Sequence, residues 1–374
     1  MNHANVLVQE RDTELIDAKA VFRGSYASER PILRNATDLA GCVSLLELGA
    51  RLGLIELLRR ETSVDADRLA TELSLPADKM RALLHAYVAA GLLVKNPVGK
   101  SFSRSEEFDD YLYFSGYVLW GLSACRPFIE HTRDYLCAPT APQSHPRDGG
   151  LVAVFSEWVG SKAFYPPVLG MIREIAPKKF VDLGCGTAKL ILGVLAAIEG
   201  STGVGVDVDP GVCRLARMNA ESRGLADRIR VVERPLQSLV EDPSPLAGAG
   251  IVHAGFVFHD LLPEETDVAI AVFRNCHKAL SETGGYMILT ELVPYRTNDR
   301  ERKFSSLLSY FHTQFMERRL PKPTEWAGLL RAAGFQEVEF FEVDMPGARI
   351  IRAQAHKGAS STTLPKFAWE TSAE

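Results

Sequence analysis

The amino-acid sequence predicts an α/β protein with a mostly parallel sheet, preceded by a separate helical domain. From residue 178 onward, short apolar runs alternate with amphipathic stretches, as strands and helices do in a parallel sheet. The first of these runs ends in a glycine-rich turn, Gly184-Cys185-Gly186, directly before a helix-favouring stretch. Residues 36–105 lack this alternation and contain amphipathic helices followed by a hairpin pattern. These observations indicate two domains of different construction.

The composition is that of an ordinary globular protein. The chain has 374 residues, of which 46% are hydrophobic and 24% charged, enough for two sizeable cores. Its net charge of −5 argues against binding nucleic acid through a general basic surface. No apolar run is long enough to span a bilayer, and residues 1–19 lack the apolar core of a secretory signal. The six cysteines form no CxxC pair, so we expect reduced thiols in a cytoplasmic protein.

The first domain is predicted to span residues 1–150. It begins with a polar arm, residues 1–34, which we expect to pack on a partner subunit or on the second domain. Glycine, proline and Asx signals then divide the chain into three helical segments and a β-hairpin. These segments cover residues 38–58, 65–75, 77–90 and 91–105. Helices followed by a hairpin wing indicate a winged helix.

A winged helix commonly binds DNA, so the charge of its third helix decides between two roles. The stretch DKMRALLHAYVAAG has only Lys79 and Arg81 near its start and is otherwise mostly apolar. Such a surface suits a subunit interface better than a DNA groove. We therefore expect a dimerisation domain and a homodimer, with DNA binding as the alternative.

The second domain is predicted to span residues 151–356, followed by a flexible tail over residues 357–374. Between the winged helix and this domain, residues 108–136 are rich in aromatic side chains, and we expect helices that line a pocket. Residues 138–150 contain several prolines and glycines and read as a loop. Five strands and a closing hairpin are expected in the second domain, over residues 180–181, 203–207, 227–232, 250–255, 284–291 and 335–355.

The neighbours of the glycine-rich turn narrow the choice of ligand. In the G-x-G-x-x-G fingerprint of dinucleotide sites, the third glycine would fall at Lys189. Asp182 adds a carboxylate that would repel a pyrophosphate on the helix N-terminus. The same carboxylate suits the ammonium and sulfonium of S-adenosylmethionine. Asp207 ends the next strand, where it can accept hydrogen bonds from ribose hydroxyls. Another nucleotide-binding sheet is the alternative.

The order VDLGCG, helix, VGVD resembles the first two motifs of the class I methyltransferases. The resemblance implies a Rossmann-like, seven-stranded methyltransferase domain that uses S-adenosyl-L-methionine. The residues expected to bind this cofactor are Asp182, Gly184, Gly186 and Asp207. The third glycine common in methyltransferase motifs is Ala188 here, a small change that still lets the methionine tail pass.

The segment HAGFVFHDLLPEET extends from the fourth predicted strand. With the winged helix and PTEWAGLLRAAGF, it resembles the two-domain small-molecule O-methyltransferases over residues 36–343. In that family a His-Asp-Trp segment stands here, and its histidine deprotonates a substrate hydroxyl. His259 and Asp260 match that segment, while Leu261 replaces the tryptophan. A neutral imidazole is a suitable base for a phenol.

His312 departs from the O-methyltransferase pattern. It lies in KFSSLLSYFHTQFMERR, the helix that lines the acceptor pocket in that family. One interpretation is a histidine packed in the pocket wall. The other joins it with His259 and Asp260 as ligands of a divalent or trivalent metal, iron or zinc. Such a set resembles the metal-dependent methyltransferases that methylate C3 of α-keto acids such as phenylpyruvate. Residues 259 and 260 can converge because the strand has ended near Phe258.

The resemblance implies a C-methyltransferase that acts on C3 of an aryl or aliphatic 2-oxo acid through a metal-stabilised enolate. Natural-product or β-methyl amino acid biosynthesis would be its setting, and His259, Asp260 and His312 its catalytic residues. Arg126 is the first candidate to pair with the substrate carboxylate, before two other arginines, Arg133 and Arg147. Trp120 is expected in the substrate pocket.

The proton acceptor stays open between a tyrosine, Glu291 and a metal-bound hydroxide. The alternative function is a metal-free O-methyltransferase that uses His259 as general base. A third hypothesis is a ligand-sensing or DNA-binding winged-helix protein with a degenerate methyltransferase domain. The intact Asp182, Gly184, Gly186 and Asp207 argue against that third hypothesis.

Overall fold

The computed structural model of the protein divides into two compact units, residues 1–111 and 112–374. The residues that it describes are 31–97, 99–138, 144–294, 299–343, 345, 347–357 and 365–370. The predicted arm therefore lies outside the described residues, apart from its last four positions. The boundary between the units falls after Tyr111 and not after residue 150, the expected domain boundary.

The first unit combines helices with a small sheet. Gly53, with φ of 75°, separates the first two helices, and the Asp65 carboxylate caps the third by accepting from two backbone amides. The three strands follow the order β1-β3-β2, and all pairs are antiparallel. This is the predicted arrangement of helices and wing. The elements are α2 (Pro31–Arg51), α3 (Leu54–Arg60), β1 (Val64–Asp65), α4 (Ala66–Glu72), α5 (Ala77–Ala89), β2 (Leu93–Lys95) and β3 (Ser101–Arg104).

The second unit is built on a seven-stranded sheet of order β6-β5-β4-β7-β8-β10-β9. Five neighbouring strands of this sheet run parallel to one another, namely β6, β5, β4, β7 and β8. Strand β10 is antiparallel to both of its neighbours, β8 and β9. The predicted fold class is confirmed. The strands are β4 (Lys179–Leu183), β5 (Thr202–Asp207), β6 (Ile229–Glu233), β7 (Ile251–Gly255), β8 (Tyr286–Leu292), β9 (Glu337–Glu342) and β10 (Ala348–Gln354).

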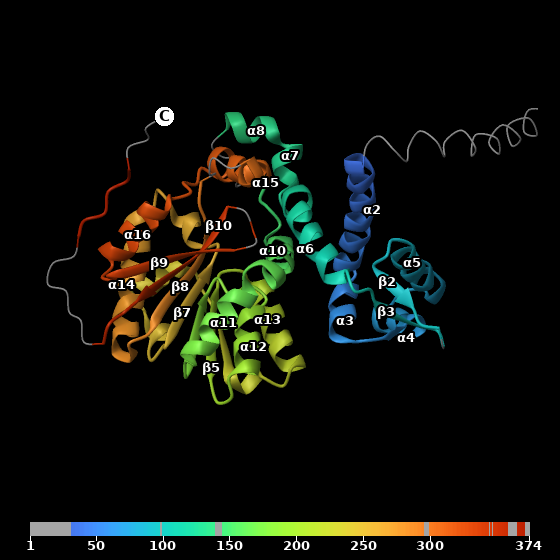
Figure 1. Ribbon diagram of the computed structural model, residues 1–374, viewed down its shortest axis with the longest axis horizontal. Helices are drawn as coiled ribbons and strands as arrows, with labels where there is room; N and C mark the ends of the chain where they lie inside the picture. The colour runs from blue at the N-terminus through green and yellow to red at the C-terminus, as the bar shows by residue number, and fades with distance from the viewer. Residues whose placement is uncertain are drawn as a thin grey trace, which may run out of the picture. The chain divides into compact units, whose positions relative to one another are not determined.

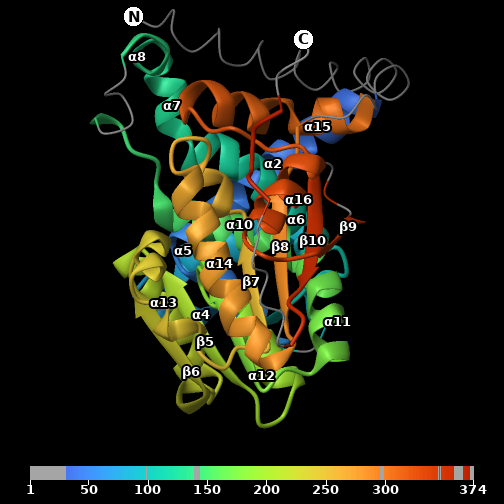
Figure 2. The same cartoon turned by 90° about the vertical axis from the view of Figure 1, so that its left-hand side faces the viewer.

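Helices cover both faces of this sheet (Figures 1 and 2). Leucine, isoleucine and valine side chains of α11 and α12 form one core with the sheet, and α14 and α16 form the other. The first face carries α10 (Gly149–Ala163), α11 (Tyr165–Ile175), α12 (Lys189–Ala197) and α13 (Pro210–Ser222), and the second carries α14 (Thr266–Thr283) and α16 (Pro323–Ala332). Short 3-10 turns join these elements at η2 (Ala226–Arg228), η3 (Leu236–Val240), η4 (Ser244–Leu246) and η5 (Phe258–Leu261).

Two helical segments above the sheet each contain a π-helical turn, a feature frequent at functional sites. Phe128 and Tyr135 of the first segment pack on Phe311 and Phe315 of the second. This packing explains why the first segment, expected in the N-terminal domain, belongs to the second unit. The elements are α6 (Phe108–Leu119), η1 (Trp120–Ala124), α7 (Arg126–Glu130) and α8 (Thr132–Cys137), then α15 (Asp299–Tyr310) and η6 (Phe311–Phe315).

The C-terminal segment differs from the expected flexible tail. Phe367 and Trp369 pack against the core on the α16 side of the sheet. The Arg319 guanidinium lies 4.3 Å from the Trp369 ring centre, and Lys322 pairs with Glu370 at 3.0 Å. Residues 365–370 therefore form a packed strap, while the remainder of the predicted tail beyond Lys357 lies outside the described residues. Within the described part of the chain, no helix is both long enough and apolar enough to cross a membrane.

Candidate active site

The glycine-rich turn connects β4 to α12. The Gly184 amide donates to the Val206 carbonyl at 2.7 Å, and Gly184 has φ of 72°. A Cβ added at Gly184 would lie 2.3 Å from the Val257 side chain, so only glycine fits there. The Gly186 amide donates to an Asp207 carboxylate oxygen at 2.9 Å, and a Cβ at Gly186 would meet open space. The turn is thus hydrogen-bonded to the end of β5 and lies close to Val257, in the segment that follows β7.

Asp182 does not lie where the cofactor prediction places it. It is buried, and its carboxylate accepts from His253 Nδ1 at 2.7 Å. Asp182 and His253 are register partners on adjacent parallel strands, so their side chains share one face of the sheet. Burial raises the pKa of Asp182, and the neighbouring His253 offsets this only in part. The carboxylate therefore supports the base of the turn and does not line the cavity.

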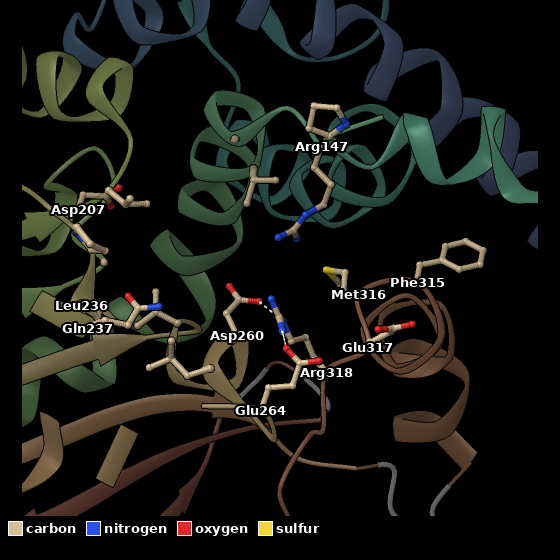
Figure 3. A pocket seen from close by; sticks show the side chains of 18 of the residues that line it. Arg147, Asp207, Leu236, Gln237, Asp260, Glu264, Phe315, Met316, Glu317 and Arg318 are labelled. Carbon is tan, nitrogen blue, oxygen red and sulfur yellow. Dashed lines mark ion pairs between the residues drawn. The ribbon is translucent and has the colours of Figure 1, made fainter. Parts of the chain in front are cut away.

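A cavity of about 760 Å³ opens at the carboxyl ends of the parallel strands, a volume typical of small-molecule sites. Asp207 and Asp260 project into it from different elements, and the Arg147 guanidinium points toward its centre (Figure 3). Ligands of open α/β sheets bind at this edge. On the side at the ends of β4, β5 and β6, the large cavity is lined by Gly184, Val206, Asp207, Val208, Arg234, Pro235, Leu236 and Gln237.

A smaller cavity of about 100 Å³ shares Arg147, Val152 and Asp260 with the large one. Its other walls are mostly apolar or aromatic, and both His259 and His312 face it. Such a lining suits an apolar ligand that lies beside a ligand in the large cavity. The remaining wall residues are Tyr117, Trp120, Ser156, Val159, Phe164, Phe256, Leu292, Leu308 and Met345.

His259 lies in η5, directly after β7, and its ring is oriented by a buried carboxylate. Nδ1 lies 2.7 Å from Glu291 Oε2, while Oε1 of the same carboxylate accepts from the Phe258 amide at 2.9 Å. Burial by itself opposes protonation of His259, but the Glu291 charge and hydrogen bond outweigh it, so the pKa of His259 is raised. Nδ1 donates to Glu291, which leaves Nε2 of the neutral ring free to accept a proton or bind a metal.

His312 lies in the π-helical turn η6. Its Nδ1 donates to the Leu308 carbonyl at 2.6 Å, which leaves Nε2 as the acceptor. The ring stacks on Trp120 with centres 5.6 Å apart and lies 4.9 Å from the His259 ring centre. Burial and the charge of His259 lower the pKa of His312 to about 3. The imidazole is therefore neutral at ordinary pH, the form that binds metals.

Asp260 follows His259 in η5 and is partly exposed. One carboxylate oxygen lies 3.9 Å from His259 Nε2 and 3.8 Å from Arg318 Nε. The strand end thus lets both neighbouring side chains point to one place, as the sequence predicted for residues 259 and 260. In the described residues, however, His259, Asp260 and His312 are not a group whose donor atoms all lie within 4.8 Å of one another. Side-chain rotation must bring them closer before all three can ligate one ion.

The three arginines proposed for the substrate carboxylate lie in different surroundings. Arg126 is mostly exposed and pairs with Glu130 at 3.5 Å, outside both cavity linings. Arg133 is also exposed and lines neither cavity. Arg147 lines both cavities (Figure 3). The structure therefore moves the first candidate from Arg126 to Arg147, because α7 turns its charged face outward while the loop before α10 crosses the cavities.

Phe256 was expected among the aromatic side chains of the pocket and lines the small cavity, but its backbone conformation was not foreseen. Phe256 has φ of 55°, an uncommon conformation for a bulky residue, and packs edge-on against Phe164. Nothing in the sequence marks this conformation. Sequence reasoning missed Leu236 and Gln237, although a signal existed, because they follow the third parallel strand, β6, and ligands of open α/β sheets bind beyond the carboxyl ends of the strands. Arg318 also lines the large cavity and pairs with Asp260, although a lone arginine has no sequence signature.

Comparisons with known proteins agree with this geometry. Residues 181–286 match the family model described as a methyltransferase domain. The chain is 42% identical over 59 residues to the ribosomal protein L11 methyltransferase of Aeromonas hydrophila subsp. hydrophila, 16% of this chain and 20% of that protein. It is 25% identical over 201 residues to the 2-ketoarginine methyltransferase of Streptomyces arginensis, 51% of this chain and 56% of that protein. The chain thus covers from about a fifth to about half of these relatives.

Solved structures are similar over most of the chain. Human N-acetylserotonin methyltransferase in complex with SAM has a TM-score of 0.54 at 20% identity, over 88% of this chain and 99% of that one. The fold is that of the class I methyltransferases. An O-methyltransferase family protein from Burkholderia thailandensis has a TM-score of 0.53 at 18% identity, over 89% and 99% of the two chains. At these identities the similarity concerns the fold alone.

Open α/β sheets bind their ligands beyond the carboxyl ends of the strands, where the large cavity lies. Asp207 offers carboxylate oxygens at the end of β5, the position for ribose hydroxyls. A Cβ at Gly186 would meet open space, but Gly186 is not among the residues that line the large cavity. Of the four residues expected to bind the cofactor, Gly184 and Asp207 line the cavity, whereas Gly186 contributes a backbone amide to Asp207.

Proposed function

We propose that the protein is an S-adenosylmethionine-dependent methyltransferase that methylates C3 of a 2-oxo acid with an apolar or aromatic side chain. The observation on which this depends is that His259 and His312 face one small apolar cavity, each with Nε2 open, beside Asp260. Two neutral imidazoles and a carboxylate form a facial ligand set suited to iron or zinc. The 25% identity to a 2-ketoarginine methyltransferase supports a 2-oxo acid as acceptor.

The walls of the small cavity favour an apolar side chain on the acceptor. Asp260 is the one carboxylate among the described residues that line it, and the Arg318 guanidinium already lies beside Asp260. A guanidinium such as that of 2-ketoarginine would therefore find few partners. Arg147 can pair with the acceptor carboxylate through two parallel hydrogen bonds. The acceptor would lie with its carboxylate at Arg147 and its side chain between Phe256 and Trp120.

The two histidines suit a metal for separate reasons. His312 is held neutral by burial, and its Nδ1 hydrogen bond fixes the tautomer with Nε2 open. His259 has the carboxylate partner that orients metal-ligating histidines in many proteins. A metal bound there would act as a Lewis acid toward the carboxylate and keto oxygens of the acceptor. The 3.9 Å separation of His259 and Asp260 requires only a side-chain adjustment for common ligation.

The proton of C3 must be removed before the carbon can attack the methyl group of the donor. Glu291 is fully buried and both of its oxygens accept hydrogen bonds, so it orients His259 and does not reach the acceptor. Burial raises the pKa of Tyr117 above its usual value, so this phenol stays protonated and cannot take the C3 proton. Of the three acceptors that the sequence left open, a hydroxide held by the ion would then take this proton and become water. The apolar walls exclude water around the reacting atoms, which strengthens the interactions with Arg147 and Asp260.

Metal analysis of untagged protein, with turnover of phenylpyruvate and aliphatic 2-oxo acids, tests this proposal. We expect a bound transition metal, activity that is lost on chelation, and His312→Ala protein that is inactive and contains one metal ion per chain fewer than the parent. Arg126→Gln is the matched control, because Arg126 lies outside both cavities. Full C-methylation by thoroughly chelated protein would contradict the proposal.

A metal-free O-methyltransferase is the second candidate, and the His259–Glu291 pair supports it. The carboxylate holds Nδ1 at 2.7 Å and raises the pKa of the ring, so Nε2 is a competent general base without a metal. For this function we expect a phenol or enol acceptor, loss of turnover in His259→Ala and a mild effect of His312→Ala. The same two variants, assayed on phenols and on 2-oxo acids with and without chelator, distinguish the candidates.

We further propose that the first unit forms a homodimer. Leu48 on α2 and Leu52 in the turn that directly follows α2 are four residues apart and are 52% and 37% exposed, and Val94 in the wing is 53% exposed. Exposed apolar residues at helical spacing suit a subunit interface. Leu48→Glu should shift the mass measured by light scattering from dimer toward monomer, and Arg126→Gln in the second unit should not.

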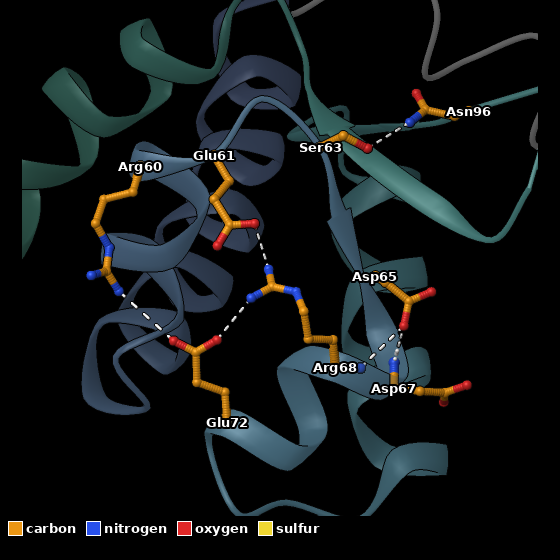
Figure 4. A network of polar contacts seen from close by, with 8 residues as sticks. All are labelled: Arg60, Glu61, Ser63, Asp65, Asp67, Arg68, Glu72 and Asn96. Atoms are coloured by element: carbon orange, nitrogen blue, oxygen red, sulfur yellow. Dashed lines mark hydrogen bonds and ion pairs between the residues drawn. The ribbon is translucent and has the colours of Figure 1, made fainter.

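The charges of the first unit support a protein interface and not a nucleic-acid one. Arg60 and Arg68 both pair with Glu72, at 3.8 and 2.9 Å, and Arg68 also pairs with Glu61 (Figure 4). Arg81 of the predicted recognition helix pairs with Asp67. These guanidinium groups are thus partly neutralised, whereas phosphate binding needs available positive charge. Saturable, sequence-selective binding in a gel-shift assay would contradict this proposal.

A further inference from the structure

A second group of metal-ligating side chains lies away from the candidate active site. His131 and Asp134, at the start of α8, meet His145, which precedes α10. Nδ1 of His131 and Nε2 of His145 lie 3.9 and 3.4 Å from Asp134 Oδ2. In the described part of the chain, this is the group of three whose donor atoms all lie within 4.8 Å of one another.

We propose that His131, Asp134 and His145 bind a zinc ion, with water as the fourth ligand. Tetrahedral ligands about 2.0–2.1 Å from zinc lie roughly 3.3 Å apart. The His145–Asp134 distance of 3.4 Å matches this spacing. The His131–Asp134 distance of 3.9 Å is longer, and a small side-chain movement would close the difference. Two imidazoles and one carboxylate are a donor set that zinc accepts, and three protein ligands leave one position for water.

The two imidazoles lie against each other, so at least one of them is neutral and has a nitrogen lone pair available for a metal. Their ring centres lie 3.6 Å apart and the rings are nearly parallel, at 5°. Two protonated rings at this distance would repel, and one Asp134 carboxylate can neutralise only one of them. Neutral rings avoid this conflict, and because the lone pairs of parallel rings do not converge, one ring must turn out of the stack when both ligate the same ion. The intermediate burial of His131 and His145 limits their side-chain freedom while Asp134 stays open to solvent.

The backbone around His145 is already held in place. The Tyr135 hydroxyl donates to the His145 carbonyl, and the Asp148 amide donates to the Ala124 carbonyl at 3.2 Å. Beside the Tyr135 hydrogen bond, a zinc ion would add a second link between α8 and the segment that leads to Arg147. Because Arg147 lines both cavities, the ion would act as a structural clasp that holds this arginine in position.

Zinc titration of the untagged full-length chain tests the site by calorimetry. The titration uses His312→Ala protein, in which the other proposed metal site is disabled. We expect about one zinc ion to bind, His131→Gln/His145→Gln to abolish this saturable binding, and Asp134→Asn to weaken it at least about tenfold. His356→Gln is the matched control, because His356 pairs with a single carboxylate, Glu337, at 3.6 Å.

Cobalt(II) gives a second measurement, since a tetrahedral site with imidazole ligands produces visible absorption that the double variant should lose. The proposal is overturned if the zinc isotherm of the double variant superimposes on that of its parent, or if His356→Gln weakens binding as much as Asp134→Asn. The readout is binding and not turnover, so failure of the proposed methyl transfer would leave this test unaffected.

Discussion

The two groups of histidine and aspartate in this protein differ in burial and in spacing. His259 and His312 are buried, and each ring has a dedicated hydrogen-bond partner on Nδ1, but their donor atoms and those of Asp260 are not all close together. His131 and His145 are partly exposed and share one carboxylate, with all three donor atoms near one another. The side chains of the buried group are held by hydrogen bonds but lie farther apart. The side chains of the surface group lie close together but are more exposed.

This difference indicates different uses. A catalytic ligand set must leave room for the acceptor between its members; in the buried group, burial keeps His312 neutral, and a hydrogen bond on each Nδ1 orients each ring. A structural ion needs only close donors, and exposed side chains can supply them without a surrounding core. The pKa of His312, lowered to about 3 by burial, marks the first group as one whose protonation state the protein controls. The predictions below test how far this contrast extends.

His259→Ala should have the largest effect. It removes the general base in the O-methyl mechanism and a ligand in the C-methyl mechanism, so we expect kcat/KM to fall by about 100- to 10,000-fold. The measurement is steady-state methyl transfer to phenols and to 2-oxo acids. Retention of more than a tenth of the activity on both acceptor classes would show that the buried group is not catalytic.

Glu291→Gln should reduce activity by about 10- to 100-fold, as expected for loss of an orienting partner. It should also change the pH profile, because the Glu291 charge raises the pKa of His259. With that charge removed the pKa falls, so the acid limb of the kcat/KM profile should move to lower pH. A profile that loses height without moving would mean that Glu291 acts only in packing.

Arg147→Gln should raise the KM for a 2-oxo acid by about 10- to 100-fold, the loss expected for a hydrogen bond to a charged group. Arg126→Gln should leave KM within about twofold, because this residue pairs with Glu130 at the surface. The two variants compare the arginine that the structure selects with the one that the sequence favoured. Equal effects would contradict the assignment to Arg147.

Asp134→Asn should have the smallest effect of these substitutions, and this effect is measured on stability. In metal-free protein its carboxylate is exposed, so we expect the free energy of unfolding in urea to change by less than about 1 kcal/mol. Added zinc should stabilise the parent protein but not the variant. A large loss of stability without zinc would show that the surface group is an ion-pair network and not a metal site.

Much of the fold could be predicted from the sequence, because local patterns specify it. Gly53 interrupts a helical pattern, Asp65 stands before another, and both positions have these roles in the structure. The alternation after residue 178 yields the parallel strands in the expected order along the chain. The tail was predicted less well, since Phe367 and Trp369 are too few to form a local pattern and become ordered only by packing on the core.

The glycine-rich turn and its place at the strand ends follow from the sequence alone, because backbone geometry there admits few residues. The sequence also identified His259, Asp260, His312 and Trp120, which line the small cavity. Only the tertiary structure decided which carboxylates and arginines reach the cavities. Asp182 is sequestered by His253 across two strands, and Arg147 replaces Arg126, because strand register and the path of a loop determine where a charged side chain ends. Such choices depend on residues far apart in the chain, and no local pattern records them.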